Sequence, residues 1–214
     1  MAVVDPTLDV ELALLSAGAT CVIGCDEVGR GALAGPVGVG VAVVNAASAA
    51  IPAGLRDSKM LSQPRRELLA PLAADWALHS AVGLASALEV DRLGIIAALG
   101  LAGKRALAQL HAAGVDVAGA VVLLDGNDDW LNKALNTPLN VVTRVRADQD
   151  CASVAAASVI AKVHRDALMI AADAVTPGYQ WAGNKGYGSA AHMDAIALLG
   201  PTVLHRKSWL KITA

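Results

Sequence analysis

The feature that most restricts the fold is a stretch of 25 residues, 31–55, that contains no charged side chain. Its length would suffice for a membrane-spanning helix. However, the stretch contains two prolines and five glycines, which interrupt a helix at several points. A pair of buried β-strands explains it better, and the valine-rich run 37–44 is predicted to be one of them, next to a strand at 22–25.

The composition favours one globular domain with a core of small aliphatic side chains. Of the 214 residues, 55% are hydrophobic and 17% charged, which argues against disorder. There are 45 alanines but four tryptophans, two tyrosines and no phenylalanine, so the elements must pack closely. Three cysteines without metal-ligand spacing fit a reducing cytoplasm. The first 20 residues carry Asp5, Asp9 and Glu11 but no Lys or Arg, unlike a secretory signal.

The order of the expected elements indicates an α/β fold. Strands are predicted at 22–25, 37–44, 78–85, 120–124 and 139–145, and helices at 62–76, 89–113, 153–174 and 189–199. Three consecutive strands, followed by helices and strands in alternation, predict a mixed sheet covered by helices.

Acidic residues follow several of these strands. Asp26, Asp125 and Asp148 each come at or near a strand end, and Glu27 follows Asp26. Chemistry in open sheets gathers at such ends. Four clustered carboxylates would repel one another unless a cation lay among them, and oxygen ligands favour Mg²⁺ or Mn²⁺. Two such ions could promote phosphodiester hydrolysis. The alternative is that each acid is solvated or caps a helix.

The geometry of a strand restricts this hypothesis. Adjacent strand residues point to opposite faces, so Asp26 and Glu27 can serve one site only if the strand ends or bulges there. The turn Gly29–Arg30–Gly31 could approach a sugar-phosphate closely, or could be a tight turn with an exposed arginine. Tyr187 could stack on a sugar or base, or cover the edge of the core.

Ordered sequence blocks resemble the type 2 ribonuclease H family, the bacterial ribonucleases HII. The first block is Gly-Cys-Asp-Glu-Val-Gly-Arg-Gly at 24–31, followed by Asp-Ser-Lys at 57–59 and Leu-Asp-Gly-Asn at 124–127. Further matches are Asp148, ten residues before Ser158, the run 155–163, Lys-Gly-Tyr at 185–187, and His-Arg-Lys-Ser-Trp at 205–209. The resemblance covers roughly 22–209.

The resemblance implies a ribonuclease H-like fold, with a mixed five-stranded sheet flanked by helices and a helical C-terminal region. It implies an endonuclease that hydrolyses the RNA strand of RNA–DNA hybrids and cuts at single ribonucleotides in duplex DNA, leaving 5′-phosphate and 3′-hydroxyl ends. By the same resemblance, Asp26, Glu27, Asp125 and Asp148 hold two catalytic Mg²⁺ or Mn²⁺ ions, with Asp150 as a rival for the fourth place.

The resemblance also implies how the substrate is recognised. Gly29, Arg30 and Gly31 would read the 2′-hydroxyl, and Tyr187 would pack on the next deoxyribose. The set of candidate phosphate contacts consists of Lys59, Lys162, Arg165, Arg206 and Lys207, for which the alternative is a solvated charge. His192 and His205 are expected to be structural or solvated, and neither is placed in the catalytic set. Four positions depart from the family pattern, namely Met60, Asn184, Gly188 and Trp209, and two of them flank Tyr187.

The expected organisation is an N-terminal extension at 1–20, a catalytic domain at 21–200 and a C-terminal segment at 201–214 that contributes to substrate binding. We expect a cytoplasmic monomer without membrane contact, and we find no obvious clamp-binding motif. The type 3 enzyme would need an added N-terminal domain, for which 20 residues are too few. A silent hybrid-binding module would not need four acids, and a nucleotide binder would need a G-x-G-x-x-G turn that is missing here.

The charge distribution refines the expected mode of binding. The net charge of −2 argues by itself against a basic nucleic-acid surface. Residues 1–20 contribute −3, so the remainder carries +1, and two divalent ions would raise that to +5. Binding of a duplex should therefore depend on metal and be sensitive to salt.

Overall fold

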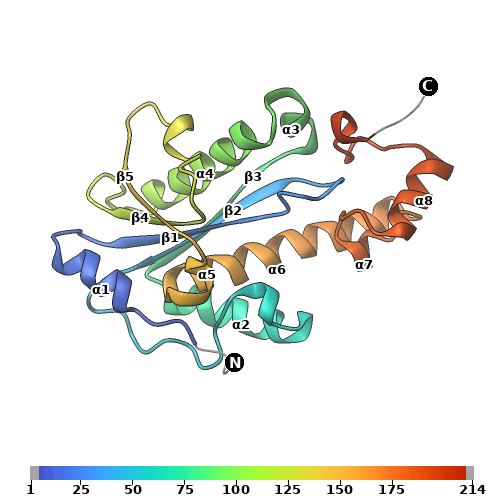
Figure 1. The fold of residues 1–214 in the computed structure, drawn as a ribbon. Coiled ribbons are helices and arrows are strands. Elements are labelled where there is room, and N and C mark those ends of the chain that lie inside the picture. Colours follow the sequence, from blue (N-terminus) through green and yellow to red (C-terminus); the bar gives the residue numbers. More distant parts are fainter. Residues whose placement is uncertain (1–4, 211–214) are drawn as a thin grey trace.

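The computed structural model describes residues 5–210 and centres on a five-stranded mixed sheet (Figure 1). The strands are β1 (Val22–Val28), β2 (Val37–Val44), β3 (His79–Ala85), β4 (Val121–Asp125) and β5 (Asn140–Arg144). Their order across the sheet is β3-β2-β1-β4-β5. The first three pair antiparallel, whereas β4 lies parallel to both β1 and β5. The predicted mixed five-stranded α/β sheet is confirmed.

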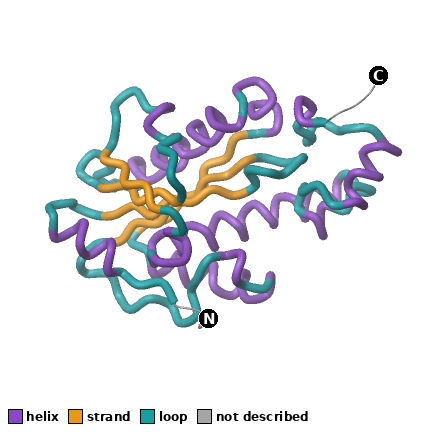
Figure 2. Tube along the Cα trace, in the orientation of Figure 1, coloured by secondary structure: helices purple, strands orange, loops and turns teal. Residues whose placement is uncertain are grey.

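Helices cover both faces of this sheet (Figure 2). The α-helices are α1 (Asp9–Ser16), α2 (Gln63–Trp76), α3 (Ala87–Leu93), α4 (Ile95–Ala112), α5 (Ala147–Asp150), α6 (Ala152–Val175), α7 (Trp181–Asn184) and α8 (Ala190–Leu199). Helix α6, with α2 beside it, packs on one face, and α4 packs on the other. Short 3₁₀ turns lie at η1 (Ser58–Met60), η2 (Asn132–Ala134) and η3 (Lys207–Trp209). No described helix is long and apolar enough to cross a membrane.

Two expected element boundaries are wrong for identifiable reasons. The single helix predicted at 89–113 is two helices, α3 and α4, because Gly94 adopts a φ of 78° between them. A capping box between Ser86 and Glu89 starts α3 before the predicted position. Strand β1 continues to Val28, three residues beyond the predicted end at Cys25, because its pairing with β2 continues through those residues.

Glycines allow the helices to lie very close to the sheet. A Cβ atom on Gly24 would come within 2.3 Å of the Ser153 backbone in α6, and one on Gly40 within 2.4 Å of the Ala157 carbonyl oxygen. On the other face, a Cβ on Gly83 would come within 2.0 Å of the Ala102 carbonyl oxygen in α4. The chain has few large aromatic side chains to fill its core, and its helix and strand backbones lie in close contact instead. At Gly24 and Gly40 this contact sets the distance between α6 and the strands β1 and β2.

The N-terminal segment is tied to the start of α6. Thr7 bridges Cys151, and the Thr7 carbonyl accepts a hydrogen bond of 2.9 Å from the Ala152 N–H. Glu11 is fully buried, and its Oε1 accepts bonds of 2.9 Å and 2.8 Å from the Ser153 N–H and hydroxyl. The side chain thus caps the first turn of α6. The described part of the predicted extension 1–20 packs on the domain that follows it.

The C-terminal region forms a small apolar cluster beyond the sheet. Tyr179, Trp181, Ala195 and Ile196 pack there around Met169 of α6. The chain then returns to the turn after β1, where His205 bridges Ala34. The last four residues of the predicted segment 201–214 lie outside the described residues.

The substitution Gly40→Ala tests the close contact between α6 and the sheet. The added methyl would overlap the Ala157 carbonyl oxygen, so we expect the free energy of unfolding to fall by about 1–3 kcal/mol. Chemical denaturation measures this change. Gly183→Ala is the matched control, because a Cβ there meets no atom within 4 Å. Equal stability of the Gly40→Ala variant and the wild-type protein would contradict this account.

Candidate active site

A cavity of about 200 Å³ brings together residues from five distant parts of the chain. Its lining consists of Asp26, Glu27, Val28, Gly29, Arg30, Gly31, Ser58, Lys59, Asp125, Ser158, Lys162 and Tyr187. Most of the site residues predicted from the sequence are in this set. Asp148, Arg165, Arg206 and Lys207 are not, and their positions are described below.

Asp26 and Glu27 reach the same cavity although the strand neither ends nor bulges at them. The ladder between β1 and β2 is regular from Val22 to Val28, so the expected condition for a shared site is not met. Asp26 is buried, with 3% of its surface exposed, whereas Glu27 is half-buried and pairs with Arg30 at 3.2 Å. The cavity lies at the rim of the sheet, where both side chains can border it.

The parallel register explains how Asp125 joins them. Cys25 is paired with Leu124, so the next residues along β1 and β4 are Asp26 and Asp125. The Asp125 Oδ1 accepts a hydrogen bond of 2.8 Å from the Ala147 N–H, which fixes the start of α5 against the end of β4. The predicted meeting of these acids at one edge of the sheet follows from the strand pairing.

Asp148 lies near a strand end, four residues after the last residue of β5, but within the short helix α5 and not in the strand. It lies in the four-residue helix α5, after Arg146 in the left-handed conformation, and 3% of its surface is exposed. Its Oδ2 is 3.0 Å from the Lys59 Nζ. Asp150, the rival for this place, is exposed and pairs with Arg144 at 2.7 Å. The geometry therefore favours Asp148 as the fourth acid.

The cluster of acids is short of positive charge. Burial raises the pKa of Asp26 well above its ordinary value, and the neighbouring Glu27 and Asp125 raise it further. Burial and then the charge of Asp148 raise the pKa of Asp125, and burial also raises the pKa of Asp148. Lys59 is the nearest cation, and contact with Asp148 raises its pKa even though burial opposes this.

The donor set fits a hard divalent cation in its chemistry. All four acids offer oxygen ligands, which Mg²⁺ and Mn²⁺ prefer, and a cation would relieve the repulsion that contributes to the raised pKa values of Asp26 and Asp125. Within residues 5–210, no group of three or more acidic, His or Cys side chains is close enough to hold an ion without rearrangement.

The basic candidates separate into exposed and buried residues. Lys59 and Lys207 are exposed. Arg206 is fully buried, and its guanidinium donates to the carbonyls of Gly29, Arg30 and Gly35. The prediction that Arg206 contacts a phosphate is therefore wrong, because its donors already bind the backbone. Arg165 is also fully buried and donates to backbone carbonyls, so the prediction that it contacts a phosphate is wrong for the same reason.

Tyr187 borders the cavity from the C-terminal region. Its side chain is 37% exposed, and the Arg165 and Lys162 cations lie 5.5 Å and 5.8 Å from the ring centroid. Asn184 supports the loop, since its Oδ1 accepts from the Gly186 N–H at 2.8 Å and its Nδ2 donates to the Tyr179 carbonyl at 2.7 Å. Asn184, a departure from the family pattern, therefore still orders this loop.

The two histidines are buried and bonded to neighbouring groups, which favours the structural alternative over the solvated one. His192 lies 2.8 Å from the Tyr187 carbonyl oxygen through Nδ1 and 3.2 Å from the His205 ring through Nε2. His205 accepts a hydrogen bond of 2.9 Å from the Thr202 N–H. Burial lowers the pKa of His205 to about 4, so its ring is neutral near pH 7.

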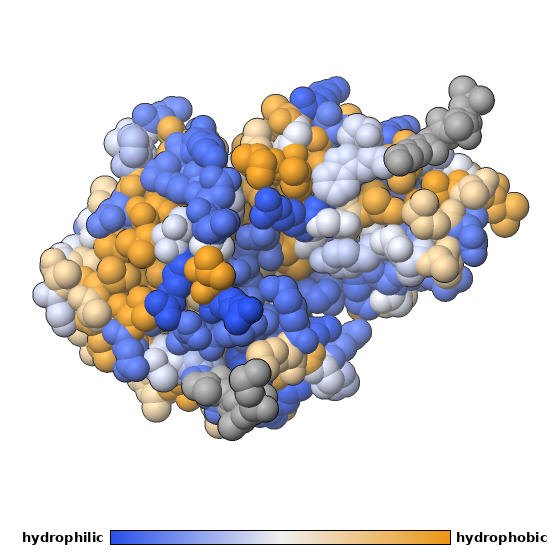
Figure 3. All heavy atoms as spheres, in the orientation of Figure 1, coloured by the Kyte–Doolittle hydropathy of each residue, from blue (hydrophilic) through white to orange (hydrophobic). Residues whose placement is uncertain are grey.

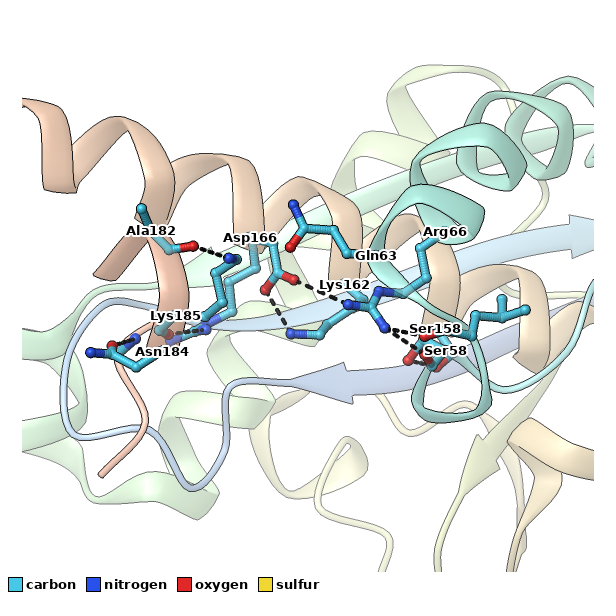
Figure 4. Close-up of polar contacts among 12 residues, drawn as sticks. Ser58, Gln63, Arg66, Ser158, Lys162, Asp166, Ala182, Asn184 and Lys185 are labelled. Atoms are coloured by element: carbon cyan, nitrogen blue, oxygen red, sulfur yellow. Dashed lines mark hydrogen bonds and ion pairs between the residues drawn. The ribbon is translucent and has the colours of Figure 1, made fainter. Parts of the chain in front are cut away.

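Sequence reasoning did not single out a polar network that links α6 with α2 and η1. Figure 4 shows Asp166 of α6 between Lys162 and Arg66, at 2.7 Å and 3.9 Å. Ser158 donates to Ser58 at 2.9 Å, also in this view. Ser158, Lys162 and Asp166 follow one another at intervals of four residues on α6. This helical spacing of polar residues was the feature of the sequence from which the network could have been predicted.

On the face seen in Figure 3, hydrophilic residues gather over the middle of the molecule. Hydrophobic residues gather toward the tip near α8, where Leu198 and Val203 are more than four-fifths exposed.

Comparison with known proteins agrees with this arrangement. The family model described as Ribonuclease HII matches residues 23–212. The chain belongs to the ribonuclease HII family. It is 45% identical to a ribonuclease HII of Streptomyces griseus over 98% of this chain and 86% of that protein. It is 44% identical to one of Thermus thermophilus over 89% and 87% of the two chains.

Solved structures share the fold. The ribonuclease H2 of Pyrococcus horikoshii has a TM-score of 0.65 at 24% identity, covering 89% of this chain and 94% of that one. Bst-RNase HIII in complex with Mn²⁺ has a TM-score of 0.70 at 23% identity, covering 91% and 68%. A ribonuclease HII from Archaeoglobus fulgidus, solved in complex with PCNA, has a TM-score of 0.66 at 24% identity, covering 90% and 96%. The ribonuclease H-like fold is thereby confirmed, and family membership makes this protein an endoribonuclease that acts on the RNA of RNA–DNA hybrids.

The substitution Lys59→Gln tests the charge balance of the site. Because the ammonium of Lys59 lowers the pKa of Asp148, its removal should raise that pKa further. Carbon-13 NMR of labelled aspartate side chains measures the titration in metal-free buffer. Lys207→Gln serves as a control, since Lys207 does not line the cavity. An unchanged or lowered pKa of Asp148 in the Lys59→Gln variant would contradict the proposed pairing.

Proposed function

We propose that this ribonuclease HII cuts hybrids and single ribonucleotides embedded in duplex DNA with two divalent metal ions. The observation that supports this most directly is the convergence of Asp26, Glu27 and Asp125 on one cavity, with Asp148 held beside it by Lys59. These four acids would hold Mg²⁺ or Mn²⁺. The ions would activate the attacking water and stabilise the leaving oxygen. Cleavage would leave 5′-phosphate and 3′-hydroxyl ends.

The protein residues would place the phosphodiester beside the acids. Gly29, Arg30 and Gly31 line the same cavity and would contact the 2′-hydroxyl, the group that distinguishes RNA from DNA. Tyr187 lies across the cavity and would pack on the following deoxyribose. Lys59 and Lys207 would contact phosphates. The Lys59 ammonium would then interact both with the Asp148 carboxylate and with a phosphate of the substrate.

We further propose that residues 201–210 contribute to substrate binding mainly by supporting the Gly29–Gly31 turn. His205 pairs with Ala34, and Arg206 holds the turn from inside. Only Lys207, exposed in this segment, would contact a phosphate directly. We infer a cytoplasmic, monomeric enzyme, and the three buried, unpaired cysteines fit a reducing compartment.

Cleavage of a DNA duplex that contains one ribonucleotide tests the proposed activity. With Mg²⁺ or Mn²⁺, the wild-type protein should cut at the ribonucleotide, and Asp125→Asn should lower kcat by at least about 100-fold because a metal ligand is lost. Gel-based kinetics measure both rates. Asp150→Asn is the matched control, because Asp150 is exposed and paired with Arg144. Equal rates for wild type and Asp125→Asn would overturn the metal site.

Substitution of Tyr187 tests the recognition of the junction. Tyr187→Ala should slow cleavage by about tenfold or more while weakening duplex binding less, because the ring positions the sugar rather than adding charge. Tyr187→Phe keeps the ring and should stay close to wild type. The measurements are single-turnover rates and binding constants from fluorescence anisotropy. If Tyr187→Ala changes neither quantity, Tyr187 lies outside the site.

A further inference from the structure

Two buried arginines behind the cavity bind backbone carbonyls instead of acids. Arg165 and Arg206 have 0% of their surface exposed. Among residues 5–210, neither has a carboxylate within 4 Å. Their guanidinium groups donate seven hydrogen bonds to six carbonyl oxygens. Burying two like charges is costly, so a site that needed only packing would be served by apolar side chains.

Arg206 holds the turn that follows β1. Its Nη2 donates to the Gly29 carbonyl at 2.7 Å and its Nη1 to the Arg30 carbonyl at 2.8 Å. Both Nε and Nη2 lie 3.3 Å from the Gly35 carbonyl oxygen. The outer face of the guanidinium is covered by Trp209, whose ring centroid lies 4.8 Å from Cζ.

Arg165 joins this turn to the loop of Tyr187. Its Nη2 and Nε donate to the carbonyls of Ala34 and Pro36 at 3.0 Å and 2.8 Å, and its Nη1 donates to the Lys185 carbonyl at 2.9 Å. The Gly186 carbonyl accepts from the Ala34 N–H at 3.1 Å, which closes the connection. A Cβ on Gly29 would lie 2.1 Å from the Arg165 Nε, so only glycine allows this approach.

The carbonyl oxygens of the turn accept hydrogen bonds from the buried Arg206 guanidinium, whereas among the described residues the N–H groups of the turn have no such partner. In the described part of the chain, the N–H groups of Gly29, Arg30 and Gly31 donate to no protein acceptor, and these residues line the cavity. Fixing one side of a peptide plane fixes the other, because the peptide unit is planar. The bonds to the Gly29 and Arg30 carbonyls therefore set the direction of the Arg30 and Gly31 N–H groups, from which a hydroxyl oxygen could accept.

We propose that Arg165 and Arg206 are positioning residues that set the discrimination between ribonucleotide and deoxyribonucleotide. They do so by orienting the Arg30 and Gly31 amides and holding the Tyr187 loop against the same turn. This inference rests on the proposed function, in which that turn contacts the 2′-hydroxyl. A planar guanidinium is required, because an ammonium cannot bind three carbonyls in this fork geometry.

The experiment compares two DNA duplexes that differ only in one 2′-hydroxyl. Dissociation constants are measured by fluorescence anisotropy in Ca²⁺, whose larger and less regular coordination disfavours cleavage, and gels check that the duplex stays intact. The measured quantity is the ratio of the two constants. In Arg206→Lys and in Arg165→Lys, the preference for the ribonucleotide should fall by about tenfold, while binding of the all-DNA duplex changes little.

Control variants separate positioning from stability. Arg92→Lys is the matched control, because Arg92 is exposed on α3, and both constants should stay at the wild-type values. Circular dichroism melting verifies that the variants fold. If the buried substitutions prevent folding, Trp209→Leu replaces them, since it uncovers the Arg206 guanidinium without removing its donors. Trp209→Leu should lower the preference for the ribonucleotide duplex by a smaller factor than Arg206→Lys does.

The outcomes distinguish this inference from the proposed function. If wild type prefers the ribonucleotide duplex and folded Arg206→Lys or Trp209→Leu keeps the whole preference, the arginines only stabilise the fold and the inference is overturned. If wild type itself shows no preference, the turn does not read the 2′-hydroxyl, and both proposals fail. A lower preference with intact binding of the all-DNA duplex supports the inference.

Discussion

The close contact between α6 and the sheet is the constraint on which the site depends. Helix α6 carries Ser158, Lys162 and Arg165, which border or support the cavity. Its height above β1 and β2 is set by Gly24 and Gly40, where any side chain would overlap the helix backbone. A helix displaced outward by even one methyl group would move all three polar side chains away from the acids on β1 and β4. The alanine-rich composition makes this contact possible, because small side chains let the backbones of a helix and a strand approach each other closely.

A second constraint is electrostatic. The cavity gathers acids on one side and buries two guanidinium groups behind it. These charges do not neutralise one another through direct pairs. Instead, Arg165 and Arg206 are satisfied by carbonyl dipoles, while among the described residues the four acids pair only with Lys59, at Asp148, and with Arg30, at Glu27. The protein thereby keeps its acids available for cations and its turn amides available for substrate, which direct Arg–Asp pairs would have prevented.

Much of this architecture could be predicted from the sequence, because the signals were local. Short apolar runs rich in β-branched residues indicated the strands, and the acids near their ends identified the rim of the sheet. The missed features depend on contacts between distant segments. The placement of Asp148 in α5 follows from Ala147 binding Asp125, and the burial of Arg206 follows from its contact with a turn about 170 residues earlier. Residue type alone cannot distinguish an arginine that binds phosphate from one that binds carbonyls.

The parallel pairing of β1 with β4 also bears on how the protein folds. Asp26 and Asp125 become neighbours only when these two strands pair across a sequence separation of about 99 residues. Contacts of such separation form slowly, and usually after local hairpins such as that of β1 with β2. The repulsion between the acids is thus deferred until most of the chain is already in place. A site that is electrostatically costly in the native state imposes little cost on the early steps by which the chain reaches that state.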